Sequence, residues 1–295
     1  MQTAAQNSHE HSSVRAVPLT DHIGADILSV DLSQPLRETD FQAIYDAWMA
    51  HQVLRFRGQE LTKEQLLDFS ARFGELDKAP INMKGEPWLP GYPNLAVMSN
   101  IIEQGQPMGS LGYGEAVWHT DMSYIETTPS AALLYAREVT RSGGETGFLN
   151  MYHAYETLPA DLKGAIEGKR IKHDASRNSA GQLRKGFKEA SDPRETPGAE
   201  HPIIIRHPVT QRHALYLGRR PLSCIVGLPL DESENLLDRL WAHATREEFA
   251  WFQKWDVGDL LMWDNRCVLH KRTAFDPSER RYMLRTQVKG SRPTA

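Results

Sequence analysis

The amino-acid sequence predicts a mainly β fold with flanking helices, arranged as a β-sandwich or jelly roll. Short strand-like runs dominate from residue 115 onward, and turn residues separate them. Helical periodicity is concentrated near the N-terminus and in two later segments. Numerous short strands with helices mainly at one end favour sheet-on-sheet packing over alternating strand–helix units.

The first elements should be short strands and a helix. Residues 16–32 alternate in apolar character around Gly24, which predicts one or two strands with a turn. A helix should start at Thr39, because Thr39 and Gln42 have the spacing of a capping box. Its apolar positions recur at helical spacing: Phe41, Ile44, Tyr45, Trp48 and Met49.

A strand and a second helix come next. Residues 53–58 predict a strand that ends at Gly58. Thr62 and Gln65 repeat the capping-box spacing, and Gly74 is placed to stop the second helix.

Residues 75–115 predict a long irregular segment. Prolines recur through it, at positions 80, 87, 90, 93 and 107. A loop of this length inside a compact domain is usually a lid or a binding loop. The alternative is a surface excursion without a function.

The remainder of the chain should hold strands and two helices. One helix covers residues 160–167 and opens at Pro159. The other covers residues 231–243, with an apolar face. The strand-like runs are residues 117–124, 130–136, 146–149, 203–207, 214–217, 259–263 and 282–288.

Composition limits the class of protein. The net charge of -4 shows no basic excess, so nucleic acid is not an expected partner. The chain has only two cysteines, and residues 1–14 lack the features of a signal peptide, so we expect a cytoplasmic location without a membrane segment. We expect residues 1–14 to form a flexible tail and residues 15–295 a single catalytic domain.

His119-x-Asp121 is a first candidate metal site. In an extended strand, residues i and i+2 point to the same face, roughly 6–7 Å apart. An imidazole and a carboxylate are two of the three ligands in the facial triad that suits non-haem Fe(II). Taken alone, the pair is better explained as a strand histidine that hydrogen-bonds to a neighbouring carboxylate.

A second group of polar residues lies near the C-terminus. His270 follows an apolar strand, and Arg281 and Arg285 come after it. In a strand over residues 281–288, both arginines share one face with Met283 and Gln287. Two such arginines must face solvent or anions, and the guanidinium fork suits a carboxylate. The alternative is a solvated basic edge.

The order of these residues resembles the taurine dioxygenase/TfdA family of Fe(II)/2-oxoglutarate dioxygenases. That pattern runs His-x-Asp, threonine, distant histidine, arginine, and the residues here are His119, Asp121, Thr146, His270 and Arg281. Residues 56–59, 142–146 and 258–266 also look like the family's, and the likeness extends from about residue 17 to 290.

The resemblance implies a double-stranded β-helix, a cupin-like jelly roll. It implies that His119, Asp121 and His270 bind Fe(II) and form the catalytic centre, with 2-oxoglutarate and O2 as co-substrates. Thr146 and Arg281 would hold the distal carboxylate of 2-oxoglutarate. The presence of Asp121 argues for hydroxylation, since related halogenating enzymes lack that carboxylate. By analogy the protein would be a homodimer or homotetramer.

The resemblance also bears on the substrate. Arg285 stands where family members hold the anionic group of the substrate, although it could instead contact the C1 carboxylate of 2-oxoglutarate. We therefore expect hydroxylation of a small organic anion, either a sulfonate or a carboxylate such as an aryloxyalkanoate, with release of succinate and CO2.

Two departures from the family argue against taurine itself. Taurine-specific members carry an asparagine where this chain has Glu115, and a histidine and a tyrosine in the loop that here includes Asn82 and Lys84. We expect these three residues in the substrate pocket. Glu115 would repel a second negative charge, or would pair with an amino group or with Lys84; the alternative is a surface glutamate.

Two other classes of function fit part of the pattern. A zinc-dependent hydrolase also uses two histidines and a carboxylate, but it would not need Arg281 and Thr146. A jelly-roll binding protein would not need an intact ligand set. Asn265 and Arg266 should orient the surroundings of His270, or else make strand-end hydrogen bonds. Other histidines should be structural or exposed: His51, His173, His201, His207, His213 and His243.

Overall fold

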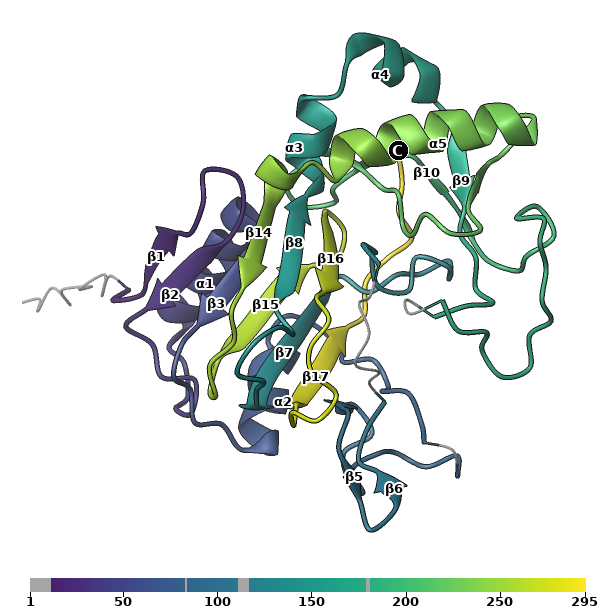
Figure 1. Ribbon diagram of the computed structural model, residues 1–295. Coiled ribbons are helices and arrows are strands. Elements are labelled where there is room, and N and C mark those ends of the chain that lie inside the picture. The colour runs from purple at the N-terminus through teal and green to yellow at the C-terminus, as the bar shows by residue number, and fades with distance from the viewer. Residues whose placement is uncertain (1–11, 83, 111–116, 179–180) are drawn as a thin grey trace, which may run out of the picture.

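A seven-stranded sheet forms the centre of the molecule, in the order β1-β2-β3-β15-β7-β17-β4 (Figure 1). The computed structural model describes residues 12–82, 84–110, 117–178 and 181–295. All neighbouring strands of this sheet are antiparallel except β2 and β3. Its strands are β1 (Arg15–Pro18), β2 (Ala25–Leu28), β3 (Val53–Phe56), β4 (Ala96–Ser99), β7 (Ala131–Glu138), β15 (Leu260–Asp264) and β17 (Tyr282–Val288).

A smaller antiparallel sheet, in the order β14-β8-β16, faces the large one and completes the jelly roll predicted from the sequence. Its strands are β8 (Thr146–Asn150), β14 (Ala250–Gln253) and β16 (Val268–Arg272). Apolar side chains from both sheets form one buried cluster, which includes Leu134 of β7 and Phe148 of β8. The face-to-face packing of two sheets leaves room for a ligand at one end of the sandwich.

Two helices cover the other face of the large sheet, α1 (Glu38–His51) and α2 (Lys63–Ala71). Strand β7 shows how the sheet packs on both of its faces. Ala132 and Leu134 belong to the cluster between the sheets, whereas Leu133 and Tyr135 pack with the helices. Side chains of a strand alternate between faces, and both faces of β7 are buried.

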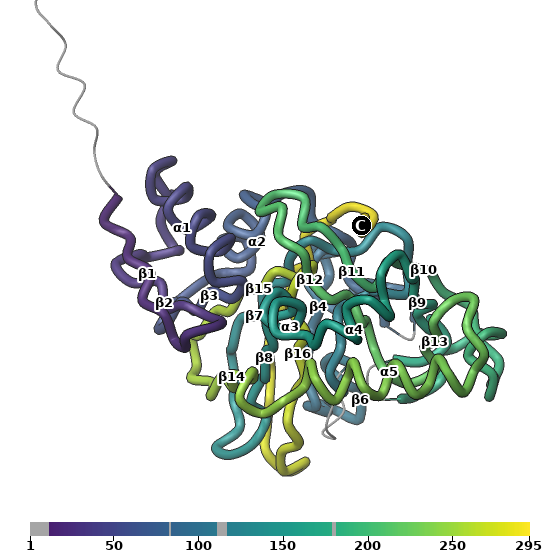
Figure 2. The backbone as a smooth tube through the Cα atoms, turned by 90° about the horizontal axis from the view of Figure 1, so that it is seen from above, coloured from purple at the N-terminus to yellow at the C-terminus, as the bar shows by residue number. Residues whose placement is uncertain are grey.

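Three further α-helices lie at one end of the two-sheet sandwich, at the top in Figure 1 and over the strands in the view from above (Figure 2). They are α3 (Met151–Glu156), α4 (Ala160–Ile166) and α5 (Leu230–Ala244). Three short sheets complete the fold, formed by β9 (Arg170–Lys172), β10 (Glu200–Pro202) and β13 (Cys224–Ile225), by β11 (Ile204–Arg206) and β12 (His213–Leu215), and by β5 (Ile102–Glu103) and β6 (Gln106–Pro107). Among the described residues, no helix is long and apolar enough to cross a membrane.

The two predicted capping boxes have different outcomes. The box at α2 is confirmed, because Thr62 accepts from the backbone of Gln65 and the Gln65 side chain accepts from the backbone of Thr62. The box at Thr39 is wrong. Helix α1 begins at Glu38, and its N-cap Arg37 makes no capping hydrogen bond but pairs with Asp40 in the first turn.

The strand predicted over residues 117–124 is also wrong. Only His119 makes isolated bridges there, to His270 and Arg219, and a turn follows in which Met122 has a φ of 52°. His119 and Asp121 are therefore brought together by a bridge and a turn. The sequence argument assumed that side chains two apart in a regular strand share one face. It predicted that His119 and Asp121 lie together, but the local structure that brings them together is not a strand.

Candidate metal and co-substrate site

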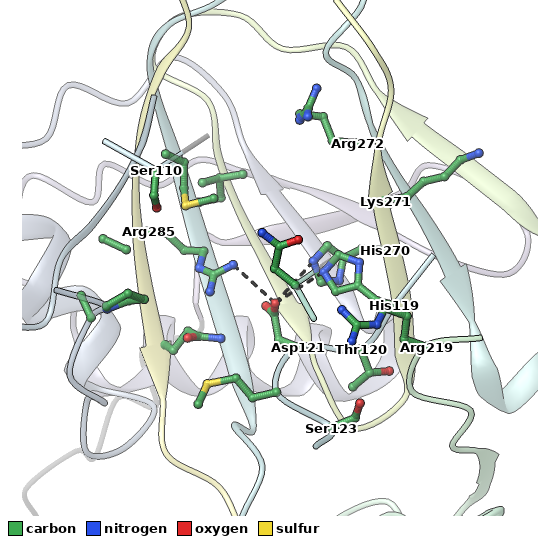
Figure 3. Close-up of a pocket in the computed structure, with 18 of the residues that line it drawn as sticks. Ser110, His119, Thr120, Asp121, Ser123, Arg219, His270, Lys271, Arg272 and Arg285 are labelled. Atoms are coloured by element: carbon green, nitrogen blue, oxygen red, sulfur yellow. Dashed lines mark hydrogen bonds and ion pairs between the residues drawn. The ribbon is translucent and has the colours of Figure 1, made fainter. Parts of the chain in front are cut away.

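His119, Asp121 and His270 converge at one end of the jelly roll (Figure 3). One oxygen of Asp121 lies 3.7 Å from Nε2 of His119 and 3.8 Å from Nε2 of His270. One ligand atom from each residue lies within 4.8 Å of the others, which suits a shared ion. The second Asp121 oxygen is buried and has no hydrogen-bond partner among the described residues.

The backbone brings the two histidines together. His119 and His270 exchange both of their backbone hydrogen bonds, each 2.9 Å long. Nδ1 of His119 lies 2.8 Å from the carbonyl oxygen of Val117, so it donates there when the ring is neutral and directs an unprotonated Nε2 at Asp121. Such a contact selects the tautomer that a metal requires.

A buried amide fastens Asp121 to the turn after β15. Oδ1 of Asn265 accepts from the backbone N–H of Asp121 at 2.9 Å, and Nδ2 donates to the Asp121 carbonyl at 3.0 Å and to the Pro129 carbonyl at 3.1 Å. The sequence offers two roles for Asn265, orienting the surroundings of His270 or making strand-end hydrogen bonds; its side chain holds the backbone of Asp121. Since β16 follows this turn and carries His270, Asn265 links two arms of the triad.

The charges of the triad suit metal ligation. Burial opposes the ionisation of Asp121, but the positive charge of Arg285 and the proximity of His270 hold its pKa well below the usual range. Burial and the neighbouring His119 lower the pKa of His270 to about 3, so its imidazole is neutral near pH 7. A carboxylate and neutral imidazoles are the protonation states that a divalent metal needs, and these residues therefore fit Fe(II).

Arg281 is a buried cation close to the triad. It is only 3% exposed, and its guanidinium has no hydrogen-bond or ion-pair partner among the described residues. Burial, and then the nearby charge of Arg272, lower the pKa of Arg281 to about 9. A buried cation without a counter-ion is costly, so this position suits an anion.

Thr146 lies in the same cavity, on strand β8. It pairs in register with Arg272 of β16, and its hydroxyl accepts from Nε1 of Trp255 at 3.0 Å. With that acceptor position used, the hydroxyl proton of Thr146 is available to donate. Thr146 and Arg281 therefore both bring hydrogen-bond donors to this cavity; that they hold one carboxylate stays a prediction from the family resemblance.

Arg285 projects from β17 between apolar neighbours. It pairs in register with Ala96 of β4 and Leu134 of β7, and its Nη1 lies 3.4 Å from Asp121. The predicted alternation of β17 is confirmed, since Arg285 and Gln287 line the cavity whereas Leu284 packs in the core beneath the helices.

A cavity of about 940 Å³ is lined by His119, Asp121, His270, Thr146, Arg281 and Arg285. Basic side chains outnumber acidic ones in its wall. The basic residues are Lys78, Arg184, Arg219, Lys271, Arg272, Arg281 and Arg285; the acidic ones, among the described residues, are Asp121 and Asp174. Trp88, Met98, Leu134 and Trp263 contribute apolar surface. Such a cavity suits an anion with an apolar body.

The long loop reaches the cavity with different residues from those predicted. Lys78 and Trp88 line it, whereas Asn82 and Lys84 do not. Asn82 instead accepts from the backbone of Lys84 and Glu86 in a tight turn, and Lys84 is exposed. Glu115 lies outside the described residues. Spacing within an irregular loop does not reveal which side chain points inward.

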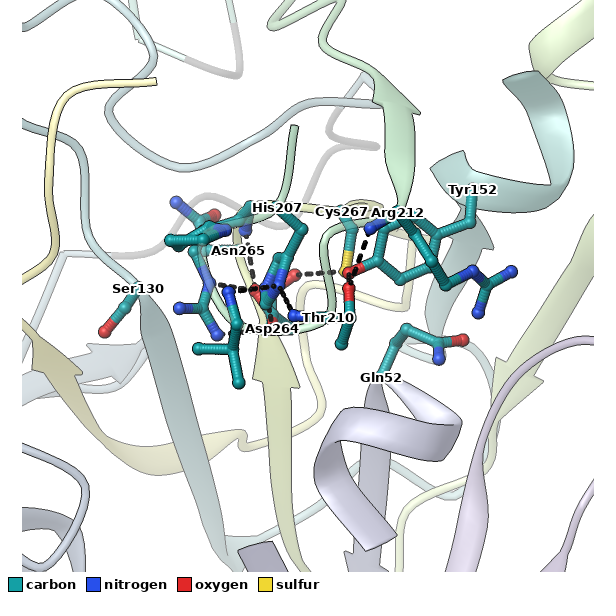
Figure 4. Close-up of polar contacts among 12 residues, drawn as sticks. Gln52, Ser130, Tyr152, His207, Thr210, Arg212, Asp264, Asn265 and Cys267 are labelled. Atoms are coloured by element: carbon teal, nitrogen blue, oxygen red, sulfur yellow. Dashed lines mark hydrogen bonds and ion pairs between the residues drawn. The ribbon is translucent and has the colours of Figure 1, made fainter. Parts of the chain in front are cut away.

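The predicted structural role is confirmed for His207, but His173 lies in the cavity wall. His207 is buried, lies 3.0 Å from Asp264 and accepts from two backbone N–H groups (Figure 4). Arg266 also pairs with Asp264. His207, Asp264 and Cys267 are close enough to bind an ion together, but both nitrogens of His207 already have partners, so we regard this cluster as structural.

Comparison with known proteins places these observations in a family. Residues 15–287 match the family described as taurine catabolism dioxygenase TauD, TfdA family. The chain is 35% identical over 279 residues to an alpha-ketoglutarate-dependent 2,4-dichlorophenoxyacetate dioxygenase of Cupriavidus pinatubonensis, covering 92% of this chain and 96% of the relative. It is 31% identical over 283 residues to a pentalenolactone F synthase of Streptomyces arenae, covering 88% and 90%.

A solved structure has the same architecture. The crystal structure of AAD-2 in complex with Mn(II) and N-oxalylglycine superposes with a TM-score of 0.78 at 29% identity. The superposition covers 96% of this chain and 100% of that one.

Proposed function

The chain belongs to the TauD/TfdA family and is an Fe(II)- and 2-oxoglutarate-dependent dioxygenase, and we propose that it hydroxylates a small organic anion. His119, Asp121 and His270 are the proposed ligands of Fe(II). The observation that carries this proposal is one cavity that joins a metal-competent triad to a buried arginine without a counter-ion. A zinc hydrolase would have no use for that arginine.

The bound Fe(II), with 2-oxoglutarate and O2, supplies the oxidising power for an unactivated C–H bond, with release of succinate and CO2. The task of the protein is ligation and orientation. Arg281 would pair with the distal carboxylate of 2-oxoglutarate, and Thr146 would donate a hydrogen bond to it. Pairing offsets the cost of taking that carboxylate out of water and sets the direction of the co-substrate.

Arg285 would bind the anionic group of the substrate. Its guanidinium lies beside Asp121, so an anion held there would be next to a proposed ligand of Fe(II). The cavity is much larger than 2-oxoglutarate alone requires, and its wall includes Trp88, Met98 and Leu134. A carboxylate with an aromatic body fits this combination, and a relative named for 2,4-dichlorophenoxyacetate supports the aryloxyalkanoate class.

The test has two stages. Anaerobic addition of Fe(II) and then 2-oxoglutarate to the full chain should produce the visible metal-to-ligand charge-transfer band of a chelated keto acid. Addition of Zn(II) in place of Fe(II) should give no band. Folded protein that develops no band with Fe(II) would contradict the proposed ligands and the co-substrate site together.

The second stage compares phenoxyacetate with 2-phenoxyethanol, its neutral counterpart. Phenoxyacetate should shift the charge-transfer band and stimulate succinate release under air, whereas the alcohol should do neither. Preference for the alcohol would overturn the assignment of an anionic substrate. Assembly as a homodimer or homotetramer is a separate proposal from the family resemblance, which sedimentation of the full chain would check.

A further inference from the structure

Arg184 lines the same cavity as the triad, and its guanidinium has no hydrogen bond or ion pair among the described residues. It lies over the ring of Tyr124, which also lines the cavity, with the guanidinium carbon 4.0 Å from the ring centroid. A guanidinium stacked in this way keeps the N–H donors at its edge for an anion. The side chain is half-buried, and none of its unpaired nitrogens is enclosed by the described residues, so a ligand can reach them.

Antiparallel pairing between two short stretches of chain holds Arg184 in place. Leu183 bridges to Arg177, and the backbone N–H of Arg184 donates to the Ser176 carbonyl at 2.7 Å. Side chains alternate between the two faces of such a pair. Gln182 and Arg184 line the cavity, whereas Leu183, between them, is exposed outside its wall. The pairing therefore directs the side chain of Arg184 to the cavity.

These paired stretches are fastened to the segment beside the metal site. Nη2 of Arg219 donates to the Asp174 carbonyl at 3.1 Å and to the Arg177 carbonyl at 2.8 Å. Arg219 also bridges to His119. Burial, partly offset by Asp174, and then the charge of Arg184 lower the pKa of Arg219, so Arg184 is near enough to act on it.

Arg184 and Arg285 reach the cavity from separate parts of the fold. Arg285 projects from β17 of the large sheet, whereas Arg184 belongs to the stretches that Arg219 fastens. Figure 3 shows Arg219 and Arg285 on opposite sides of the Asp121 carboxylate. A ligand that contacts both Arg184 and Arg285 would therefore extend across the part of the cavity that the triad lines.

The charge balance of the wall leaves Arg184 for a ligand. The acidic side chains of the described wall are Asp121 and Asp174. Asp121 lies 3.4 Å from Arg285, and Asp174 lies 3.5 Å from Arg219. Neither pairs with Arg184, and an unpaired cation in a concave wall attracts an anion.

We propose that Arg184, held on the ring of Tyr124, is a second anion-binding residue of the substrate pocket, and that the preferred substrate carries two anionic groups. This inference rests on the proposed function, in which Arg285 holds one of these groups. It adds the chemical class, which is a dianion such as a dicarboxylate with an apolar body. The second anionic group would bind the edge of the Arg184 guanidinium.

The experiment compares phenoxyacetates that differ by a single charge. The full chain, loaded anaerobically with Fe(II) and 2-oxoglutarate, is titrated with 3- and 4-carboxyphenoxyacetate and with the corresponding carbamoyl compounds, which are similar in size but have one negative charge less. The shift of the charge-transfer band gives each Kd at constant ionic strength. The better of the two dicarboxylates should bind about tenfold more tightly than its carbamoyl analogue, because hydrogen bonds between two charged groups are the stronger ones.

Variants of the arginine assign that preference. Arg184→Gln should remove most of it by weakening the dicarboxylate, and Arg184→Lys, which keeps the charge without the planar fork, should keep part of it. The matched control is Lys185→Gln, which removes the same charge from the next residue, an exposed lysine outside the cavity wall. This control should bind every compound as the wild type does.

Variants of the ring test how the arginine is held. Tyr124→Phe keeps an aromatic face and should retain the preference for the dicarboxylate, whereas Tyr124→Leu should reduce it. Equal loss of the preference in both variants would overturn the role of stacking.

The outcomes separate the two proposals. Absence of the band before any phenoxyacetate is added is a failure of the proposed function itself. A normal band overturns the role of Arg184 alone if neither dicarboxylate is preferred, if Arg184→Gln leaves the preference unchanged, or if Lys185→Gln reduces it as much. Equal weakening of the dicarboxylate and its carbamoyl analogue in Arg184→Gln also overturns the second subsite, because Arg184 would then bind a carboxylate that both compounds share. A normal band that no compound shifts overturns the dianionic substrate.

Discussion

Two parts of the cavity are built in different ways: the part around the triad, called here the inner end, and the part lined by Lys78 and Trp88, called here the outer end. At the inner end, backbone pairing joins His119 to His270 and the Asn265 amide holds Asp121. At the outer end, Lys78 and Trp88 come from irregular segments. A metal site must keep its ligands close to one geometry, and strand pairing provides that rigidity. Loops tolerate sequence change, so substrate preference can differ among relatives that share the metal site.

The names of the relatives agree with this contrast. One is named for 2,4-dichlorophenoxyacetate and another for pentalenolactone F synthesis, although both match nearly the whole chain. Substitutions at the inner end should therefore abolish or strongly reduce the 2-oxoglutarate-dependent reaction that the relatives share. Substitutions at the outer end should change affinity for particular substrates.

The largest effect is expected at the triad. His270→Ala should lower Fe(II) affinity by at least about a hundredfold, because loss of a ligand should exceed the cost of losing a residue that only supports one. Equilibrium binding of Fe(II) under anaerobic conditions measures this directly. His213→Ala is the matched control and should bind normally; comparable weakening in both variants would remove His270 from the metal site.

Arg281→Ala should have the next largest effect. Removal of one partner from a buried charge pair costs several kcal/mol, so 2-oxoglutarate affinity should fall roughly a hundredfold while Fe(II) affinity is retained. Titration of the charge-transfer band with 2-oxoglutarate gives the value. Arg280, an exposed neighbour paired with Glu138, supplies the control variant Arg280→Ala. Unchanged dependence on 2-oxoglutarate in Arg281→Ala would exclude that arginine from the co-substrate site.

Removal of the Asn265 side chain, which holds the backbone of Asp121, should have an intermediate effect. Asn265→Ala leaves the backbone of Asp121 without its partners, so Fe(II) affinity should fall about tenfold to a hundredfold and stability by about 2 kcal/mol. Metal binding and denaturant unfolding are measured on the same samples. Asn94→Ala removes a similar amide, which donates to the carbonyls of Leu76 and Asp77. Equal loss of metal affinity in both variants would mean that Asn265 affects metal binding only through the stability of the fold.

The smallest effect distinguishes two lysines of the same loop. Lys78 lines the cavity, so Lys78→Ala should raise KM for phenoxyacetate a few-fold at low salt, and added salt should shrink the difference. Lys84→Ala should change nothing. A larger effect at Lys84 than at Lys78 would restore the sequence-based assignment and contradict the loop geometry.

Several features of the fold could be predicted because their signals are local. The capping box of α2 lies within four residues, and the alternation of β17 repeats every second residue. Helix α5 was found because its buried residues follow helical spacing. The short α3 was missed, since six residues hold less than two helical turns and its cap, Asn150, doubles as the last residue of a strand.

The sequence by itself determined which residues the proposed site contains and their order along the chain: His119, Asp121, Thr146, His270, Arg281 and Arg285. Only the tertiary structure decided how they are held. The Asn265–Asp121 bonds join residues 144 positions apart, and one cavity is lined by the triad and by Arg281 and Arg285 from a separate strand. Periodicity reports which face of an element a residue occupies, whereas these contacts depend on how distant segments pack, which no local pattern encodes.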